Sequence, residues 1–221
     1  MKPRLLDLFC GAGGCARGYT DAGFEVVGVD IVNQPHFPYE FHQADALTFP
    51  LDGFDAYAAS PLCQHFTNML NWDESYKDNH PDYIDIMRQR FLETKKPYVI
   101  ENVEGARDFL INPILLCGNM FGLRVYRHRL FESNVFLFAH SHVKHQAKAA
   151  KASKIPRENE FWSPVGCFGR KDDAQKSMGI NWMKTTGSRD REIAQAIPPA
   201  YTKYIGDQLL SIIQAESEII A

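Results

Sequence analysis

The stretch Asp7-Leu8-Phe9-Cys10-Gly11-Ala12-Gly13-Gly14 places a glycine-rich turn directly after a short apolar run. That run, residues 5–9, has the length and the branched and aromatic side chains of a buried strand, and residues 13–22 can form a helix. A second apolar run follows at residues 25–30. The order strand, turn, helix, strand predicts a β-loop-α-β unit, whose glycines let backbone N–H groups face a ligand at the start of the helix.

Two further apolar runs continue this alternation. Residues 55–60 and 98–103 are predicted strands that end in polar residues, and residues 83–93 between them can form a helix. The pattern predicts an α/β fold with a doubly wound, mostly parallel sheet of the Rossmann-like type. In such sheets ligands bind beyond the carboxyl ends of the strands.

The chain changes character after Phe138, where lysine and alanine accumulate. Residues 139–186 are therefore expected to form a small insertion outside the sheet. The main domain then consists of residues 1–138 and 187–221. Its last part is expected to form a short helix, a break at Pro198-Pro199 and a final helix.

Size and composition limit the class of protein. A chain of 221 residues fits one domain with a small appendage. Its apolar runs are far too short to cross a bilayer, and its N-terminus lacks a signal-peptide pattern, so a cytoplasmic monomer without a membrane partner is expected. Five irregularly spaced cysteines fit reduced thiols better than a disulfide framework, and the odd number leaves at least one thiol free.

The net charge of −3 hides a basic segment. Between residues 133 and 157 there are five Lys or Arg residues and no acidic residue. Lys144, Lys148 and Lys151 would line one face if this segment were helical, and such a stripe can follow a phosphate backbone. A solvated surface or a loop would explain the same charges.

Three more motifs place reactive side chains at or near strand ends: Ser60-Pro61-Leu62-Cys63-Gln64, Glu101-Asn102-Val103 and Arg127-His128-Arg129. A thiol, a carboxylate and a guanidinium beside a nucleotide-type pocket indicate covalent attack on an electrophilic ring. Asp30 ends the second predicted strand, about 20 residues after the turn, where it can accept hydrogen bonds from ribose hydroxyls. A nicotinamide cofactor would suit the same geometry, but the turn departs from the glycine spacing of dehydrogenases at the third glycine.

In their order and intervals, these four motifs resemble those of the DNA (cytosine-5) methyltransferases that use S-adenosylmethionine. The likeness runs from residue 5 to about residue 206 and is greatest with the small members found in bacteriophages. It implies a catalytic methyltransferase domain, with residues 139–186 as a target-recognition insertion. It also implies methyl transfer to C5 of a flipped-out cytosine in double-stranded DNA.

The resemblance assigns a role to each catalytic candidate. Cys63 adds to C6 of the base, and Arg129 faces O2. Glu101 gives a proton to N3 or shares one with it, and it accepts a hydrogen bond from the amino group of the cytosine. Arg127 orients Glu101 or binds phosphate, and Asn102 anchors the strand end. The C-terminal segment packs beside the glycine turn, and the implied cofactor-binding residues are Phe9, Gly11, Gly13, Gly14, Asp30, Ile31, Asp45, Ala46, Gln195, Ala196 and Ile197.

Three positions depart from the family pattern. Leu62 stands where the family has proline, Val125 where it has glutamine, and Gln195 where it has asparagine. Proline fixes the backbone, so leucine can loosen the alignment of the Cys63 thiolate. Two alternatives therefore stay open: a catalytically impaired DNA- or cofactor-binding module, and an RNA cytosine-5 methyltransferase.

No metal site is predicted. Metal-ligating side chains do occur in the second half of the chain, but their spacing contains no tight ligand pair of the kind seen in zinc sites. They are Cys117, His140, His142, His145 and Cys167.

Overall fold

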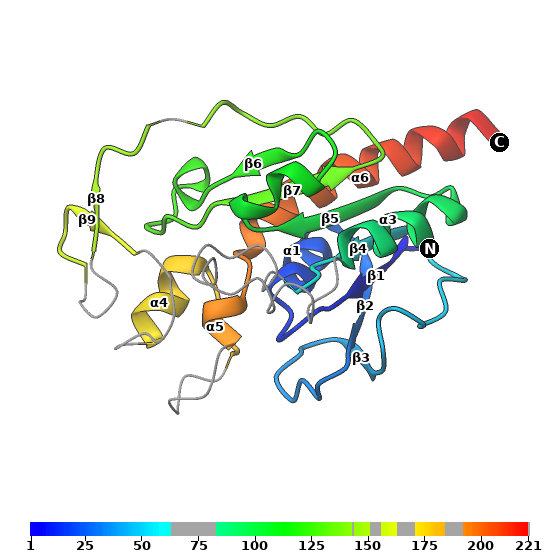
Figure 1. Ribbon diagram of the computed structural model, residues 1–221, viewed down its shortest axis with the longest axis horizontal. Helices are drawn as coiled ribbons and strands as arrows, with labels where there is room; N and C mark the ends of the chain where they lie inside the picture. Colours follow the sequence, from blue (N-terminus) through cyan, green and yellow to red (C-terminus); the bar gives the residue numbers. More distant parts are fainter. Residues whose placement is uncertain (63–82, 143, 151–155, 163–170, 184–191, 221) are drawn as a thin grey trace.

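A seven-stranded sheet forms the centre of the computed structural model, which describes residues 1–62, 83–142, 144–150, 156–162, 171–183 and 192–220 (Figure 1). The strand order is β3-β2-β1-β4-β5-β7-β6. Neighbouring strands are parallel from β3 to β5, whereas β7 is antiparallel to both β5 and β6. The strands are β1 (Arg4–Leu8), β2 (Glu25–Asp30), β3 (Glu40–Gln43), β4 (Ala56–Ala59), β5 (Tyr98–Asn102), β6 (Ile114–Leu116) and β7 (Arg129–Ser133).

Helices and two short strands surround this sheet. The strands β8 (Lys148–Ala149) and β9 (Glu160–Phe161) pair with each other, apart from the main sheet. No helix in the described part of the chain is both long and apolar enough to cross a membrane. The α-helices are α1 (Gly14–Ala22), α3 (Tyr83–Thr94), α4 (Lys171–Met178), α5 (Glu192–Gln195) and α6 (Pro199–Ile220), and the 3-10 helices are η3 (Glu104–Phe109) and η4 (Gly118–Phe121).

Two apolar clusters cover the two faces of the sheet. On one face α1 and α6 pack together, and Leu5, Tyr19 and Tyr201 belong to the same buried cluster. On the other face α3 contributes Met87 to a cluster that contains Leu6. Because successive residues of a strand point to opposite faces, β1 supplies both clusters from neighbouring positions. This explains why its sequence is a continuous apolar run.

The segment that follows β7 contradicts one expectation. The helical stripe of lysines is wrong, because Lys144 lies in irregular structure and Lys148 belongs to β8. Side-chain contacts hold this segment in an extended path: the Tyr126 ring stacks on His145 with 3.6 Å between ring centroids, and the Tyr126 hydroxyl donates to the backbone oxygen of Ala147 at 2.9 Å. Lys151 lies outside the described residues.

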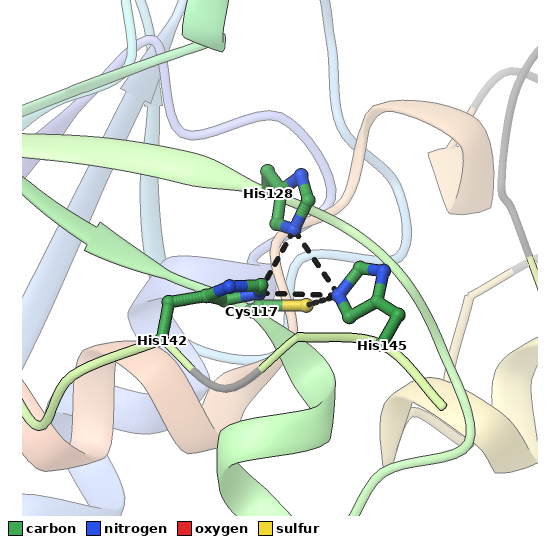
Figure 2. Close-up of side chains that lie close together, drawn as sticks. All are labelled: Cys117, His128, His142 and His145. Atoms are coloured by element: carbon green, nitrogen blue, oxygen red, sulfur yellow. Dashed lines mark hydrogen bonds between the residues drawn. The ribbon is translucent and has the colours of Figure 1, made fainter. Parts of the chain in front are cut away.

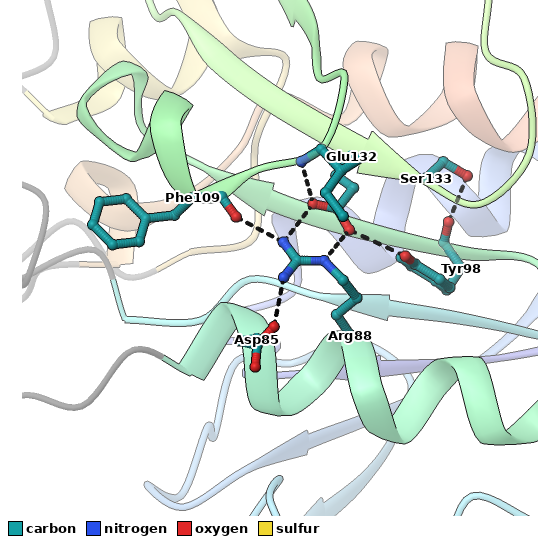
Figure 3. A network of polar contacts seen from close by, with 7 residues as sticks. Asp85, Arg88, Tyr98, Phe109, Glu132 and Ser133 are labelled. Carbon is teal, nitrogen blue, oxygen red and sulfur yellow. Dashed lines mark hydrogen bonds and ion pairs between the residues drawn. The ribbon is translucent and has the colours of Figure 1, made fainter.

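A buried ion pair ties α3 to β7 (Figure 3). The Glu132 side chain is 1% exposed and accepts hydrogen bonds from Arg88 at 2.7 and 2.8 Å. It also accepts from the Tyr98 hydroxyl at 3.1 Å and from the Ile111 amide at 2.7 Å. Arg88 in turn donates to the backbone oxygen of Phe109 at 2.7 Å. The network therefore fixes β7 against β5, α3 and the end of η3.

Replacing Glu132 with glutamine is expected to lower the free energy of unfolding by about 3 to 5 kcal/mol, because the buried Arg88 guanidinium loses its main counter-charge. Urea denaturation of the two proteins measures the difference. Lys203→Met is the control, since it breaks an exposed ion pair with Asp207 and should change stability by less than about 1 kcal/mol. An equally small loss in E132Q would contradict the prediction.

Candidate active site

A cavity of about 530 Å³ opens at the carboxyl ends of β1, β2, β4 and β5. It lies where the strand order reverses between β1 and β4, which is where open α/β sheets bind ligands. Its volume is in the range of small-molecule and cofactor sites. The glycine turn, the ends of these strands and α5 supply its walls.

The cavity brings together most of the residues that the sequence predicted. Glu101, Asn102 and Arg129 line it, whereas Arg127 does not. Cys63 lies outside the described residues, but the two residues before it, Pro61 and Leu62, line the cavity. All the predicted cofactor residues except Gly13 line it as well, namely Phe9, Gly11, Gly14, Asp30, Ile31, Asp45, Ala46, Gln195, Ala196 and Ile197.

The glycine turn is shaped by contacts within the protein. Gly13 has a φ of 85°, and a Cβ at this position would lie 2.9 Å from a side-chain carbon of Pro38. A Cβ on Gly14 would lie 2.5 Å from the backbone oxygen of Ile197. These two glycines therefore let the β2–β3 connection and the C-terminal segment pack directly on the turn. The second contact shows the C-terminal segment packed beside the glycine turn, as the resemblance implied.

Asp30 is held in place at the end of β2. Its Oδ2 accepts a hydrogen bond from the Gly11 amide at 3.0 Å, and its Oδ1 accepts from the Val32 amide at 2.9 Å. A carboxylate has further lone pairs, so it can still accept from ligand hydroxyls. Next to it Ile31 and Val32 are 68% and 61% exposed, which offers an apolar surface to a ring.

Asp45 is positioned by the helix on the other side of the cavity. Arg90 of α3 donates to the backbone oxygens of Ala46 and Phe49, both at 2.6 Å. These two hydrogen bonds hold the turn that contains Asp45. Within this turn the Asp45 carboxylate accepts a hydrogen bond from the Leu47 amide at 2.9 Å. Two oriented carboxylates, Asp45 and Asp30, thus face the same cavity.

Two aromatic rings form another wall. Phe9 follows β1 and has a φ of 57°, which is unusual for a residue with a side chain and is typical of functional sites. Its ring stacks on Tyr83 with 6.0 Å between centroids. Tyr83 and Val32 also line the cavity, although the sequence did not predict either as a site residue. The signal for Val32 was its place in the apolar pair Ile31-Val32, which follows the acidic end of β2.

Glu101 and Arg129 form a partly buried ion pair in the lining of the cavity. Glu101 Oε1 lies 2.9 Å from Arg129 Nε, and the two side chains are 10% and 16% exposed. Burial raises the pKa of the Glu101 carboxyl, and Arg129 and then Arg127 offset this only in part. The pair can therefore present an acid and a cation to one substrate.

The neighbouring motif residues hold the chain in place. The Asn102 amide donates to the backbone oxygen of Pro61 at 3.2 Å and so links β5 to the segment that leads to Cys63. Arg127 is 3% exposed, and its guanidinium donates to the backbone oxygen of Ala194 at 2.7 Å. This burial leaves Arg127 little surface for the phosphate contact that was one of its two expected roles.

Asp7 is a buried acid behind the glycine turn. Neither carboxyl oxygen accepts a hydrogen bond of standard geometry from the described part of the chain. Burial, followed by the nearby charges of Asp30 and Glu101, raises the pKa of Asp7 to about 8, and the backbone amide of Ala16 acts weakly in the opposite direction. The folded protein therefore keeps a proton that the unfolded chain has already lost at neutral pH.

Replacing Asp7 with asparagine is expected to remove a pH dependence of stability. The pH range concerned lies between the ordinary aspartate pKa of 3.8 and the raised pKa of about 8. Within it, Asp7 should lower the wild-type free energy of unfolding by about 1.4 kcal/mol for each unit by which the pH rises. Urea denaturation at pH 5, 6.5 and 8 measures the difference between D7N and wild type, which should grow with pH. The exposed Asp52→Asn serves as control. Parallel pH profiles of D7N and wild type would refute the assignment.

Comparison with solved structures finds similar folds at low sequence identity. A protein described as a DNA modification methyltransferase encoded within an E. coli prophage matches with a TM-score of 0.69 at 14% identity. The S. pombe Dnmt2 methyltransferase matches with a TM-score of 0.64 at 13% identity, and the Entamoeba histolytica methyltransferase EhMeth with 0.68 at 12%. Each match covers 96% of this chain and 99% of the other. This chain has a methyltransferase fold.

No family model matches the sequence, and no curated protein does so either. The methyltransferase fold confirms the predicted Rossmann-like, mostly parallel sheet. It also agrees, at the level of the fold, with the resemblance that the four motifs carry. In this methyltransferase fold the cavity at the strand ends is the candidate active site.

Proposed function

We propose that this protein transfers a methyl group from S-adenosylmethionine to C5 of a cytosine in double-stranded DNA. The observation that carries the proposal is the Glu101–Arg129 pair, which shares one cavity with the glycine turn and Asp30. An acid beside a cation suits a ring that gains negative charge during the reaction. The methyltransferase fold of the solved structures supports methyl transfer in general.

The residues that are present fit S-adenosylmethionine. Asp30 can accept from the ribose hydroxyls, Ile31 and Val32 offer an apolar surface for the adenine, and Asp45 can accept from its amino group. Phe9 would lie against the adenine or the sulfonium. The cofactor supplies an electrophilic methyl group on a positively charged sulfur.

The chain's own residues would activate the cytosine. The Cys63 thiolate forms a bond with C6 while Glu101 gives a proton to N3, so that C5 becomes nucleophilic. The Arg129 guanidinium stabilises the charge that develops at O2. After C5 has taken the methyl group, a water-derived base removes the C5 proton. The N3 proton returns to Glu101, and the thiolate leaves as the C5–C6 double bond re-forms.

The DNA would enter beside the insertion at 139–186, which we propose as the target-recognition part. Its described residues include exposed cations at Lys144, Lys148 and Arg157, which can contact phosphates. The same part also contacts the cavity wall, because the Trp182 indole donates to the backbone oxygen of Ala12 at 2.9 Å. A base must leave the duplex to reach the cavity, at a cost of a few kcal/mol.

The test is transfer of a labelled methyl group from S-adenosylmethionine to unmethylated duplex DNA, with the product nucleoside identified by mass spectrometry. 5-Methylcytosine in DNA is the expected product, and RNA of the same sequence is offered in parallel. Methylation of the RNA alone would point to the RNA enzyme. Binding of both cofactor and DNA without any transfer would point to the impaired binding module that Leu62 suggested.

A further inference from the structure

Four metal-ligating side chains converge at the edge of the sheet (Figure 2). The Sγ of Cys117 and one ring nitrogen each of His128, His142 and His145 all lie within 4.8 Å of one another. Cys117 directly follows β6 and His128 directly precedes β7. Because β6 and β7 are antiparallel neighbours, these two residues meet at the same end of the strand pair. His142 and His145 come from the irregular segment after β7.

Four of the distances among these atoms are those of a tetrahedral metal centre. The Nε2 atoms of His128 and His142 lie 3.1 Å apart, those of His142 and His145 3.1 Å, and those of His128 and His145 3.3 Å. The Cys117 Sγ lies 3.4 Å from His145 Nε2. Zinc bonds of about 2.05 Å to nitrogen and 2.3 Å to sulfur place tetrahedral ligand atoms about 3.3 Å apart for two nitrogens and about 3.6 Å apart for sulfur and nitrogen.

Hydrogen bonds alone cannot satisfy the three imidazoles. An imidazole nitrogen is either a donor, when it carries a proton, or an acceptor, when it does not. Among three nitrogens that all lie in mutual contact, at least two must be of the same kind, so at least one pair faces donor to donor or lone pair to lone pair. A cation at the centre removes the conflict, because all three nitrogens can direct a lone pair at it.

The surroundings prepare His128 and His145 for this role. The Nδ1 of His128 lies 2.8 Å from a carboxylate oxygen of Glu104, which assigns the proton to Nδ1 and leaves the lone pair on Nε2. Carboxylates commonly orient metal-bound histidines in this way. The His145 ring is held flat against Tyr126, with 7° between the two planes. The His128 and His145 rings therefore both direct Nε2 toward the centre of the four ligand atoms.

We propose that Cys117, His128, His142 and His145 bind one zinc ion in a closed structural site. Cysteine and histidine are the ligands that zinc prefers in tetrahedral sites, and four protein ligands leave no position for a water molecule or a substrate. One thiolate and the Glu104 carboxylate together balance the two positive charges. The ion would fasten the start of the insertion to the strand pair that carries Arg129, without taking part in the chemistry.

This proposal replaces the expectation that the chain has no metal site. Spacing along the chain did not reveal this cluster, because His128 stands in the arginine motif and His140 was grouped with the other histidines. The His140 ring instead contacts Phe138, with 5.2 Å between centroids. Cys167, which was also considered, lies outside the described residues.

The experiment is a measurement of bound metal in the full chain, purified without chelators. Mass spectrometry of the metal should find about one zinc per chain in wild type and in the control His140→Gln. His142→Gln and His145→Gln should each lose most of the zinc on dialysis. Glu104→Gln should weaken zinc binding by about 10- to 100-fold in a competition titration.

A second measurement does not depend on any variant folding. Cobalt chloride added to the metal-free wild type should give the ligand-field spectrum of a tetrahedral site and a sulfur-to-cobalt charge-transfer band. A wild type with little zinc and no such cobalt spectrum would overturn the proposal. Equal zinc loss in H140Q and H142Q would also overturn it. Neither measurement uses methyl transfer, so this proposal and the proposed function can fail independently.

Discussion

A Cys63→Ala variant is expected to transfer no measurable methyl group to DNA, while it binds S-adenosylmethionine as tightly as wild type does. The reason is that C5 of cytosine becomes nucleophilic only when a group adds to C6, and alanine has no atom that can do so. Labelled-methyl transfer measures the first effect, and calorimetric titration with the cofactor measures the second. Cofactor binding should persist because Cys63 is not among the residues assigned to the cofactor.

The matched control for this variant is Cys15→Ala. Burial raises the pKa of the Cys15 thiol well above its ordinary value, so this cysteine is not a nucleophile at neutral pH. C15A should therefore keep measurable methyl transfer. DNA that contains 5-fluorocytosine should trap a covalent complex with wild type, because the water-derived base can remove a proton from C5 but not a fluorine. C63A should form no such complex. Turnover by C63A at the wild-type rate would exclude Cys63 as the nucleophile.

Replacing Glu101 with glutamine is expected to lower the rate of methyl transfer by about 10²- to 10³-fold, the usual effect of losing one group that stabilises a developing charge. Glutamine has nearly the same shape but cannot give a proton to N3. Single-turnover kinetics on duplex DNA measure the rate, and the exposed Glu93→Gln serves as the control. A loss of less than tenfold in E101Q would show that N3 does not depend on this carboxyl.

The pH dependence gives this prediction a second readout. Burial raises the pKa of Glu101, so the fraction of protonated carboxyl falls as the pH rises through a value above the ordinary one. Wild-type activity should lose this contribution as the pH rises through that raised pKa, and E101Q should lack the corresponding step. An identical pH profile in the two proteins would assign the step to another group.

The sequence was sufficient to predict those strands that a single local pattern, a short apolar run, determines. The strands β1, β2, β4 and β5 are buried runs, and the expected strands match them to within one residue at each end. Glycine, aspartate and glutamate residues were predicted as site residues because they stand at the ends of these strands. The topology of a parallel sheet brings such ends together even when they are far apart in sequence.

The sequence was insufficient where distant contacts determine the structure. β3 has no buried residue, so no apolar pattern marked it. The lysine segment was tested for helical spacing, but contacts with Tyr126 hold it in an extended path. The convergence of Cys117 with His128 depends on the antiparallel pairing of β6 and β7, and neither strand had been predicted. Spacing along the chain could not show a site that forms across a strand pair.

The contact between Gly14 and Ile197 has a consequence for the synthesis of the protein. The first strands and the glycine turn leave the ribosome early, but the segment that closes the cavity is made after every strand of the main sheet. Because domains fold as units when their chain has emerged, a nascent chain that ends before Ile197 would contain the acidic strand ends without a closed cavity. The ability to hold a cofactor should therefore arise only after the whole main sheet and the segment around Ile197 have been made.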